Sequence, residues 1–107
     1  MATSGDYLTY VLDQLSLLDG ITHRKMMGEY LIYYRGKIAA YLCDNRFLVK
    51  ILPSTRICLP DAREEAPYEG AKPMLLVENL EDRIFLRKLF DAMYPELPSP
   101  SKKGKKA

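Results

Sequence analysis

The chain has 107 residues, of which 48% are hydrophobic and 28% charged, and its formal net charge is +2. This length and balance predict one folded domain and exclude a disordered or collagen-like chain. No apolar run approaches the ~20 residues of a membrane-spanning helix, and the first residues lack the pattern of a secretory signal. We therefore expect a cytoplasmic protein without a membrane partner. Cys43 and Cys58 lack metal-ligand spacing and fit reduced thiols.

The positive charge is concentrated near the C-terminal end. Four of the sixteen basic residues are Lys102, Lys103, Lys105 and Lys106, and without these four charges the net +2 becomes −2. We therefore divide the chain into a domain at residues 1–94 and a flexible tail, rich in Pro, Ser and Lys, at residues 95–107. Such a tail either contacts nucleic-acid phosphates without reading sequence or is simply solvated.

The first predicted element is an amphipathic helix. Thr3 or Ser4 can cap it, and Asp6 is a favourable carboxylate in its first turn. Apolar residues then recur every three or four positions, at Leu8, Val11, Leu12, Leu15 and Leu18. Gly20 follows the last of them and is suited to ending the helix. One face of this helix must therefore pack against the rest of the domain.

The next segment predicts an antiparallel meander of three strands. The strands are residues 24–34, 38–43 and 46–51, with turns at Arg35-Gly36 and Asp44-Asn45. In the third strand, Phe47, Val49 and Ile51 share the face that we expect in the core. Arg46, Leu48 and Lys50 lie on the opposite face, which we expect to be at least partly wet.

The remaining elements complete an α+β fold. They are a short helix at residues 54–59, an exposed connection at 61–73, a strand at 74–77 and a helix from an Asn79 cap to a stop at Pro95. The apolar face of that helix consists of Phe85, Leu86, Leu89, Phe90 and Met93. We expect a two-layer arrangement in which two long helices cover one face of an antiparallel sheet of four to five strands, with one short helix in addition.

The meander carries a family resemblance. Residues 24–37 read RKMMGEYLIYYRGK and residues 46–50 read RFLVK. This pattern resembles the N-terminal domain of the TfoX/Sxy family, which has an Arg before Met-Phe-Gly, a Tyr-rich strand, a turn ending in Gly-Lys and a strand ending in Lys. The segments YLTYVLDQL at residues 7–15 and YEGAKP at 68–73 are similar to the family as well. Met27 stands where the family commonly has Phe, and Leu31 where it commonly has Gly.

The resemblance covers roughly residues 3–94 and implies a bacterial protein of regulatory character. It implies an effect on the transcription of genes for DNA uptake, exerted through protein contacts. Relatives with that role carry a second, C-terminal domain, in whose place this chain has the lysine tail. The expected partner is a protein, such as a transcription regulator.

The candidate partner or anion surface consists of Arg24, Tyr33, Arg46, Lys50 and Lys72. Arg46 and Lys50 share a strand face, and the family pattern includes positions matching Arg24, Lys50 and Lys72. Together these residues would suit an anion or an acidic partner. The alternative is a set of solvated charges on the open face of a half-buried sheet. Because tyrosines are enriched in interfaces as well as in cores, a homodimer is a further alternative.

Catalytic and cofactor chemistry finds little support. His23 is the one histidine in the chain, and its pairing with Cys43 or Cys58 would depend on the fold. Glu64 and Glu65 are more simply explained as solvated charges than as metal ligands, and nucleotide-binding glycine motifs are absent. We therefore expect a non-catalytic regulatory domain without a cofactor. The alternatives are a nucleic-acid accessory protein that uses the tail and, last, a small enzyme.

Overall fold

The computed structural model describes residues 3–98, which form one antiparallel sheet and its helices. In chain order the elements are α1 (Gly5–Gln14), β1 (Ile21–Met26), β2 (Glu29–Tyr34), β3 (Lys37–Cys43), β4 (Arg46–Val49), α2 (Pro53–Cys58), β5 (Glu64–Glu65), β6 (Met74–Leu76), α3 (Arg83–Met93) and the 3-10 turn η1 (Tyr94–Glu96). The strand order is β1-β2-β3-β4-β6-β5. The α+β class is confirmed, but the sheet has six strands instead of the four to five expected. The tail lysines at 102, 103, 105 and 106 lie outside the described residues.

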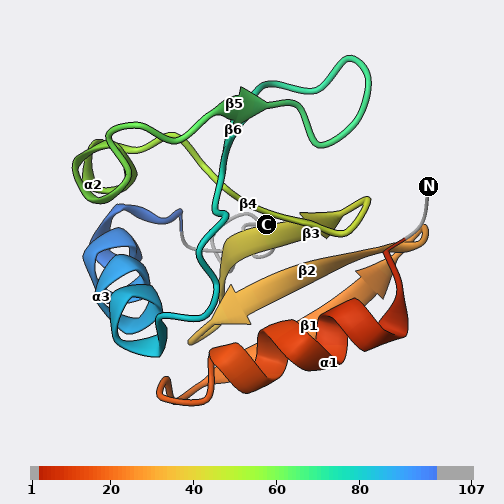
Figure 1. Cartoon of the computed structure of the whole chain (residues 1–107), viewed down its shortest axis with the longest axis horizontal. Coiled ribbons are helices and arrows are strands. Elements are labelled where there is room, and N and C mark those ends of the chain that lie inside the picture. The colour runs from red at the N-terminus through yellow and green to blue at the C-terminus, as the bar shows by residue number, and fades with distance from the viewer. Residues whose placement is uncertain (1–2, 99–107) are drawn as a thin grey trace, which may run out of the picture.

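Both long helices cover the same face of the sheet (Figure 1). The main core cluster joins Val11 and Leu15 of the α1 region to Leu86 and Phe90 of α3. Between them lie the inward residues of the strands, which are Ile32, Tyr34, Ala40, Leu42, Phe47, Val49 and Leu75. The two-layer arrangement is therefore confirmed, since every one of these strand residues belongs to the helix-covered face.

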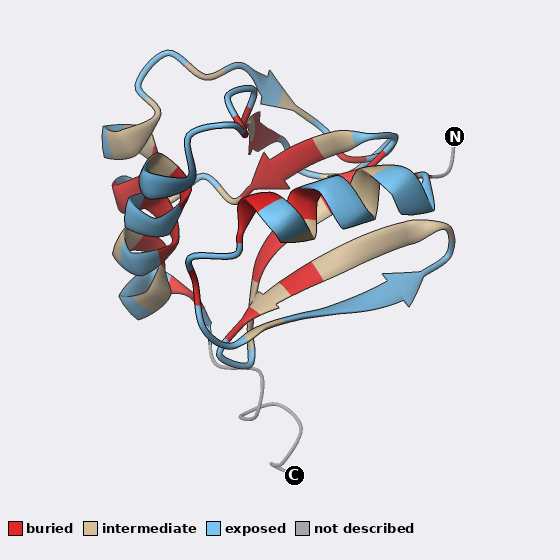
Figure 2. Ribbon diagram, turned by 60° about the horizontal axis from the view of Figure 1, so that its bottom comes forward, coloured by how far each residue is buried: buried red, intermediate tan, exposed pale blue. Residues whose placement is uncertain are grey.

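The segment expected as one strand at residues 24–34 is a hairpin. β1 and β2 pair antiparallel and are joined by a turn at Met27-Gly28, whose φ angles are +52° and +83°. Two successive positive φ angles define the mirror-image turn that suits the twist of a two-residue hairpin. Such turns prefer Asn, Asp or Gly at the first position, where this chain has Met27, so the sequence did not predict a turn here. The resulting edge strand β1 is exposed along almost its whole length (Figure 2).

The other turns of the meander match the sequence prediction. Positive φ angles occur at both residues of Arg35-Gly36 (+51° and +85°) and of Asp44-Asn45 (+56° and +55°). Gly20 also has a positive φ, and a Cβ there would lie 2.9 Å from Cγ of Arg35. Glycine is therefore required directly before β1. The prediction that Gly20 ends the first helix is wrong, because α1 already ends at Gln14.

The helix starts are set by side-chain caps. Ser4 accepts a hydrogen bond from the Tyr7 amide and caps α1, as expected. α3 is capped by Asp82, which accepts from the Phe85 amide at 3.0 Å, so the predicted cap at Asn79 is wrong. Asn79 and Asp82 are both residue types that favour an N-cap. Leu80, which lies between them, is buried in the core ahead of the helix, and the cap follows it at Asp82.

The expected exposed connection at residues 61–73 contains one short strand. Glu64 and Glu65 form β5, which pairs with β6. The part of the segment after β5, at residues 67–73, lies on the face of the sheet away from the long helices, which we call the outer face. Leu48 of β4 is 0% exposed there and packs with Cys43 and Met74. The expectation of a partly wet face is therefore wrong at Leu48 and right at its neighbours Arg46 and Lys50, which are half-buried. The expectation that Ile51 lies in the core is also wrong, because β4 ends at Val49 and Ile51 is 38% exposed.

Candidate functional site

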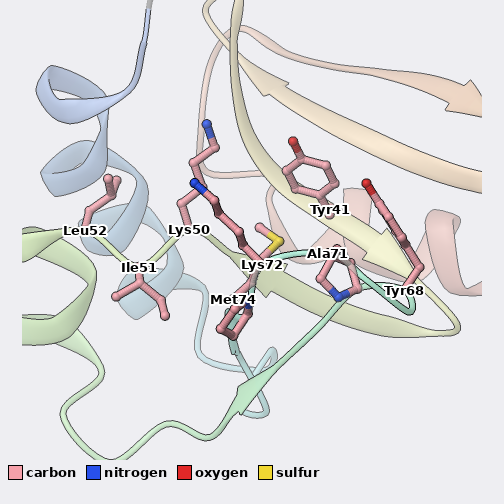
Figure 3. A pocket seen from close by; sticks show the side chains of 10 residues that line it. Tyr41, Lys50, Ile51, Leu52, Tyr68, Ala71, Lys72 and Met74 are labelled. Atoms are coloured by element: carbon pink, nitrogen blue, oxygen red, sulfur yellow. The ribbon is translucent and has the colours of Figure 1, made fainter.

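A pocket of about 550 Å³ opens on the outer face, between β3, β4 and the segment before β6 (Figure 3). Its lining consists of Tyr41, Lys50, Ile51, Leu52, Pro67, Tyr68, Ala71, Lys72, Pro73 and Met74. The volume is within the usual range for sites that hold a small ligand or a side chain of a partner. Most of the lining is apolar, and its polar groups are two lysines and two tyrosines.

Two of the predicted surface residues, Lys50 and Lys72, meet in this pocket. Lys50 directly follows β4 and is half-buried, whereas Lys72 is exposed on the segment leading to β6. In the described part of the chain, neither lysine takes part in an ion pair, and the lining contains no Asp or Glu. Their charges therefore make the pocket attractive to an anionic group.

Two tyrosines stand side by side in the same pocket, with their hydroxyls pointing the same way (Figure 3). Tyr41 comes from β3, and Tyr68 comes from the connecting segment. Burial raises the pKa of Tyr41, and the neighbouring Tyr68, Cys43 and Tyr33 raise it further. Tyr41 is therefore a neutral phenol near pH 7 and can donate a hydrogen bond. Neither tyrosine was among the candidate site residues, although Tyr68 begins the YEGAKP segment that pointed to the family.

Arg46 has a structural role next to the pocket. Its guanidinium forms an ion pair with Glu65 at 2.9 Å and donates to the carbonyls of Ala66 at 3.2 Å and Pro67 at 3.0 Å. Its Nε also donates to the carbonyl of Cys43 at 3.2 Å. Arg46 therefore does not line the pocket that contains Lys50 and Lys72. It holds the start of the segment that forms one wall of the pocket.

Arg24 and Tyr33 lie on the outer face but outside the pocket lining. Arg24 of β1 pairs with Leu31 of β2, and Leu31 pairs with Tyr41 of β3. This cross-strand row connects the exposed edge of the sheet to the pocket. The five predicted residues therefore separate into a lysine pair in the pocket, a structural arginine, and two flanking residues on the same face.

His23 and Cys43, which were considered as a catalytic pair, lie on opposite faces of the sheet. His23 lies on β1 with its ring 6.3 Å from that of Tyr30, and it alternates with Arg24, so it projects from the opposite face to the pocket. Burial raises the pKa of the Cys43 thiol to about 11, which makes it a poor nucleophile at neutral pH. Glu64 pairs with Arg56, and Glu65 with Arg46. Residues 3–98 contain no cluster of three or more His, Cys, Asp or Glu side chains that could hold a metal.

Together, the helix-covered sheet and the basic, aromatic pocket on its other face describe a small α+β domain with a candidate binding site. The TfoX N-terminal domain matches residues 13–90 of this chain, and the chain belongs to that family. This is a family of regulatory domains and not a known enzyme family, so the chain is a competence-regulator-like domain.

One relative extends this match to nearly the whole chain. It is described as the uncharacterized 12.7 kDa protein in the trpE 5' region of Spirochaeta aurantia, and it is 31% identical over 101 residues. The matched region covers 94% of this chain and 88% of that protein. No solved structure matches the chain significantly. Within residues 3–98, none of the helices has the length and apolarity to cross a bilayer.

Proposed function

We propose that the chain is a non-catalytic regulatory domain that acts by binding a protein partner through the outer face of its sheet. The observation that carries this proposal is the pocket in which Lys50 and Lys72 meet Tyr41 and Tyr68 over an apolar lining. Tyrosine provides a large, rigid contact area with a polar end, and it is enriched at the centres of protein interfaces.

The position of the pocket supports a macromolecular partner. It lies on the sheet face that the two long helices leave uncovered, and Tyr68 at its rim is 66% exposed. Leu31 and Arg24 extend the same face toward the sheet edge. A partner that fills the pocket would therefore also contact a continuous row of side chains on the neighbouring strands.

The experiment is affinity capture from the cytoplasm of the native host with three versions of the full chain. These are the wild type, the double variant Lys50→Glu/Lys72→Glu, and the control Arg87→Glu/Lys88→Glu. The control makes the same charge change on exposed residues of α3. We expect a defined partner with the wild type and the control, and its loss with the pocket variant. Identical partners for all three would contradict the proposal.

A second candidate function rests on the four lysines at 102, 103, 105 and 106. We propose non-specific contact with nucleic acid as the alternative role of this tail. Leu97 is part of the core and Glu96 accepts two hydrogen bonds from Ser54, so the truncation is best made after Pro98. If the tail binds, fluorescence anisotropy with duplex DNA shows binding by the full chain that the truncation loses, with a log–log salt slope of about −3 to −4. Equal binding by both would contradict this role.

A further inference from the structure

We propose, on the basis of the protein-binding function above, that the pocket recognises an acidic segment of its partner in which an aromatic or large apolar side chain lies beside a carboxylate. The first argument is charge. The lining has two positive side chains and no negative one, and neither lysine is neutralised by an ion pair within residues 3–98. A carboxylate supplies the missing negative charge.

The second argument is the position of the hydrogen-bond donors. The ammonium ends of Lys50 and Lys72 and the hydroxyls of Tyr41 and Tyr68 all extend toward the same side of the view (Figure 3). A carboxylate has two oxygens and accepts several hydrogen bonds at once. Ammonium and phenol groups are both donors to such oxygens, so one carboxylate can bind donors of both kinds.

The third argument is the apolar part of the lining. Met74 and Pro67 are buried, and Ile51 is exposed beside them. Methionine adapts its shape to irregular apolar groups, so this region suits an aromatic or branched side chain. An anion alone would leave this part of the pocket unfilled. A carboxylate adjacent to an apolar side chain fills both parts.

The charge distribution favours an acidic peptide over a nucleic-acid backbone. Duplex DNA is bound by a stripe of basic residues that follows its regularly spaced phosphates. On the row that leads away from the pocket, the residues are Leu31 and then Arg24, and Arg46 is already occupied by Glu65. The pocket thus holds a pair of positive charges with one further arginine at the sheet edge, which is not a continuous basic stripe.

The test uses four short peptides as probes: acetyl-Glu-Phe-Glu-amide, its Gln-Phe-Gln and Lys-Phe-Lys counterparts, and acetyl-Glu-Ala-Glu-amide. Backbone amide signals of the full chain are followed by two-dimensional NMR up to roughly 10 mM peptide, which is the range of weak fragment binding. We expect saturable shifts for residues 66–74 and 48–52 with Glu-Phe-Glu. Binding should weaken at least about fivefold with Gln-Phe-Gln or Glu-Ala-Glu, and also at high salt.

Two variants assign the binding to the pocket. Lys50→Gln/Lys72→Gln should remove the shifts, and Tyr41→Phe should weaken them, while the spectrum reports that each variant is folded. The inference is overturned if Glu-Phe-Glu causes no pocket shifts, if Gln-Phe-Gln binds equally well, or if Lys-Phe-Lys binds best. If the partner capture depends on the two lysines but the peptides fail, this inference fails and the proposed function stands. If the peptides bind as expected but the partner capture does not depend on the two lysines, the proposed function is refuted and this inference about the pocket stands.

Discussion

Arg46 reaches over β6 to pair with Glu65 at 2.9 Å, which connects β4 to the strand at the far edge of the sheet. Because its guanidinium also binds the carbonyls of Ala66 and Pro67, this contact fixes the segment that carries Tyr68 and Lys72. The pair is only about one quarter exposed on either side, so solvent screens it incompletely. The pocket therefore depends on a contact that is not part of its lining.

Replacing Arg46 should loosen the pocket wall as well as destabilise the fold. Arg46→Met removes the ion pair and takes this donor away from Glu65 and from three carbonyls, which we expect to lower the free energy of unfolding by about 1–2 kcal/mol. Hydrogen exchange should accelerate in residues 66–73 before it does in β2 and β3. Chemical denaturation and exchange mass spectrometry measure the two effects.

Arg63→Met is the matched control for this prediction. Arg63 pairs with Glu78 at 3.1 Å, but both side chains are well exposed. Such a pair contributes roughly 0–1 kcal/mol, and its loss should leave exchange in residues 66–73 unchanged. Equal effects of the two substitutions would show that Arg46 has no special role in holding the wall.

The sheet and α3 are connected by a buried hydroxyl. The Tyr34 hydroxyl donates a hydrogen bond to Asp91 at 2.6 Å, and its ring lies against Phe90 in the core. Tyr34→Phe keeps the ring and removes the donor, so we expect a loss of about 1 kcal/mol in urea denaturation. Tyr33→Phe, on the half-buried outer face, should cost less. A larger loss from Tyr33→Phe would contradict this assignment.

Stability should fall at alkaline pH. Burial, reinforced by Tyr10, raises the pKa of Tyr7 to about 12, and burial raises that of Cys43 to about 11, against ordinary values of 10.0 and 9.0. The unfolded chain therefore releases these protons first, and it binds fewer protons than the folded chain once the pH exceeds about 9. The contribution of both groups is fully present below pH 9 and is lost as pH rises through 9 to 12.

Urea denaturation at a series of pH values measures this dependence. Tyr7→Phe should make the decline above pH 10 shallower, because the substituted residue has no proton to lose. A free energy of unfolding that stays constant between pH 9 and 11 would contradict the burial of these two groups.

The turn of the first hairpin carries local strain. Met27 has a φ of +52°, a backbone conformation that residues with a side chain disfavour. Its side chain is 97% exposed, so packing contacts do little to offset this strain. Met27→Asn places the preferred Asn-Gly pair in this turn and should raise the free energy of unfolding by about 0.5–1 kcal/mol. Met26→Asn, within strand β1, should not stabilise. Thermal denaturation compares the two, and stabilisation by Met26→Asn alone would contradict this reading of the turn.

Hydrophobic periodicity was sufficient to predict much of the fold. It placed the start of α1 and the apolar faces of α1 and α3 correctly, because residues such as Val11 and Phe90 recur at helical spacing. It extended α1 too far, because Leu15 and Leu18 continue the apolar spacing although the helix ends at Gln14. It failed at Met27-Gly28, where Gly28 suits the turn but Met27 stands at the position where such turns prefer Asn, Asp or Gly. It also failed at β5, because a two-residue strand of glutamates has no pattern of its own.

The candidate site was predictable only in part. Alternation along β4 and the family pattern both pointed to Lys50, and the family pattern also pointed to Lys72. The role of Arg46 was hidden, because its partners at residues 65–67 are distant in sequence and two of them are backbone carbonyls. Tyr68 joins Tyr41 only when the segment before β6 folds against the outer face. These contacts depend on tertiary structure, which residue spacing does not encode directly.

The central claim, that a partner protein contacts the pocket, is tested most directly by site-specific photo-crosslinking in the native host. A photoreactive phenylalanine analogue replaces Tyr68 at the pocket rim or, as a control of equal exposure, Ile84 on α3, the two being 66% and 67% exposed. We predict a discrete crosslinked protein from position 68, absent from position 84 and lost when Lys50→Glu/Lys72→Glu is combined with it. The same crosslinked protein from position 84, or its persistence in the lysine variant, would contradict the claim.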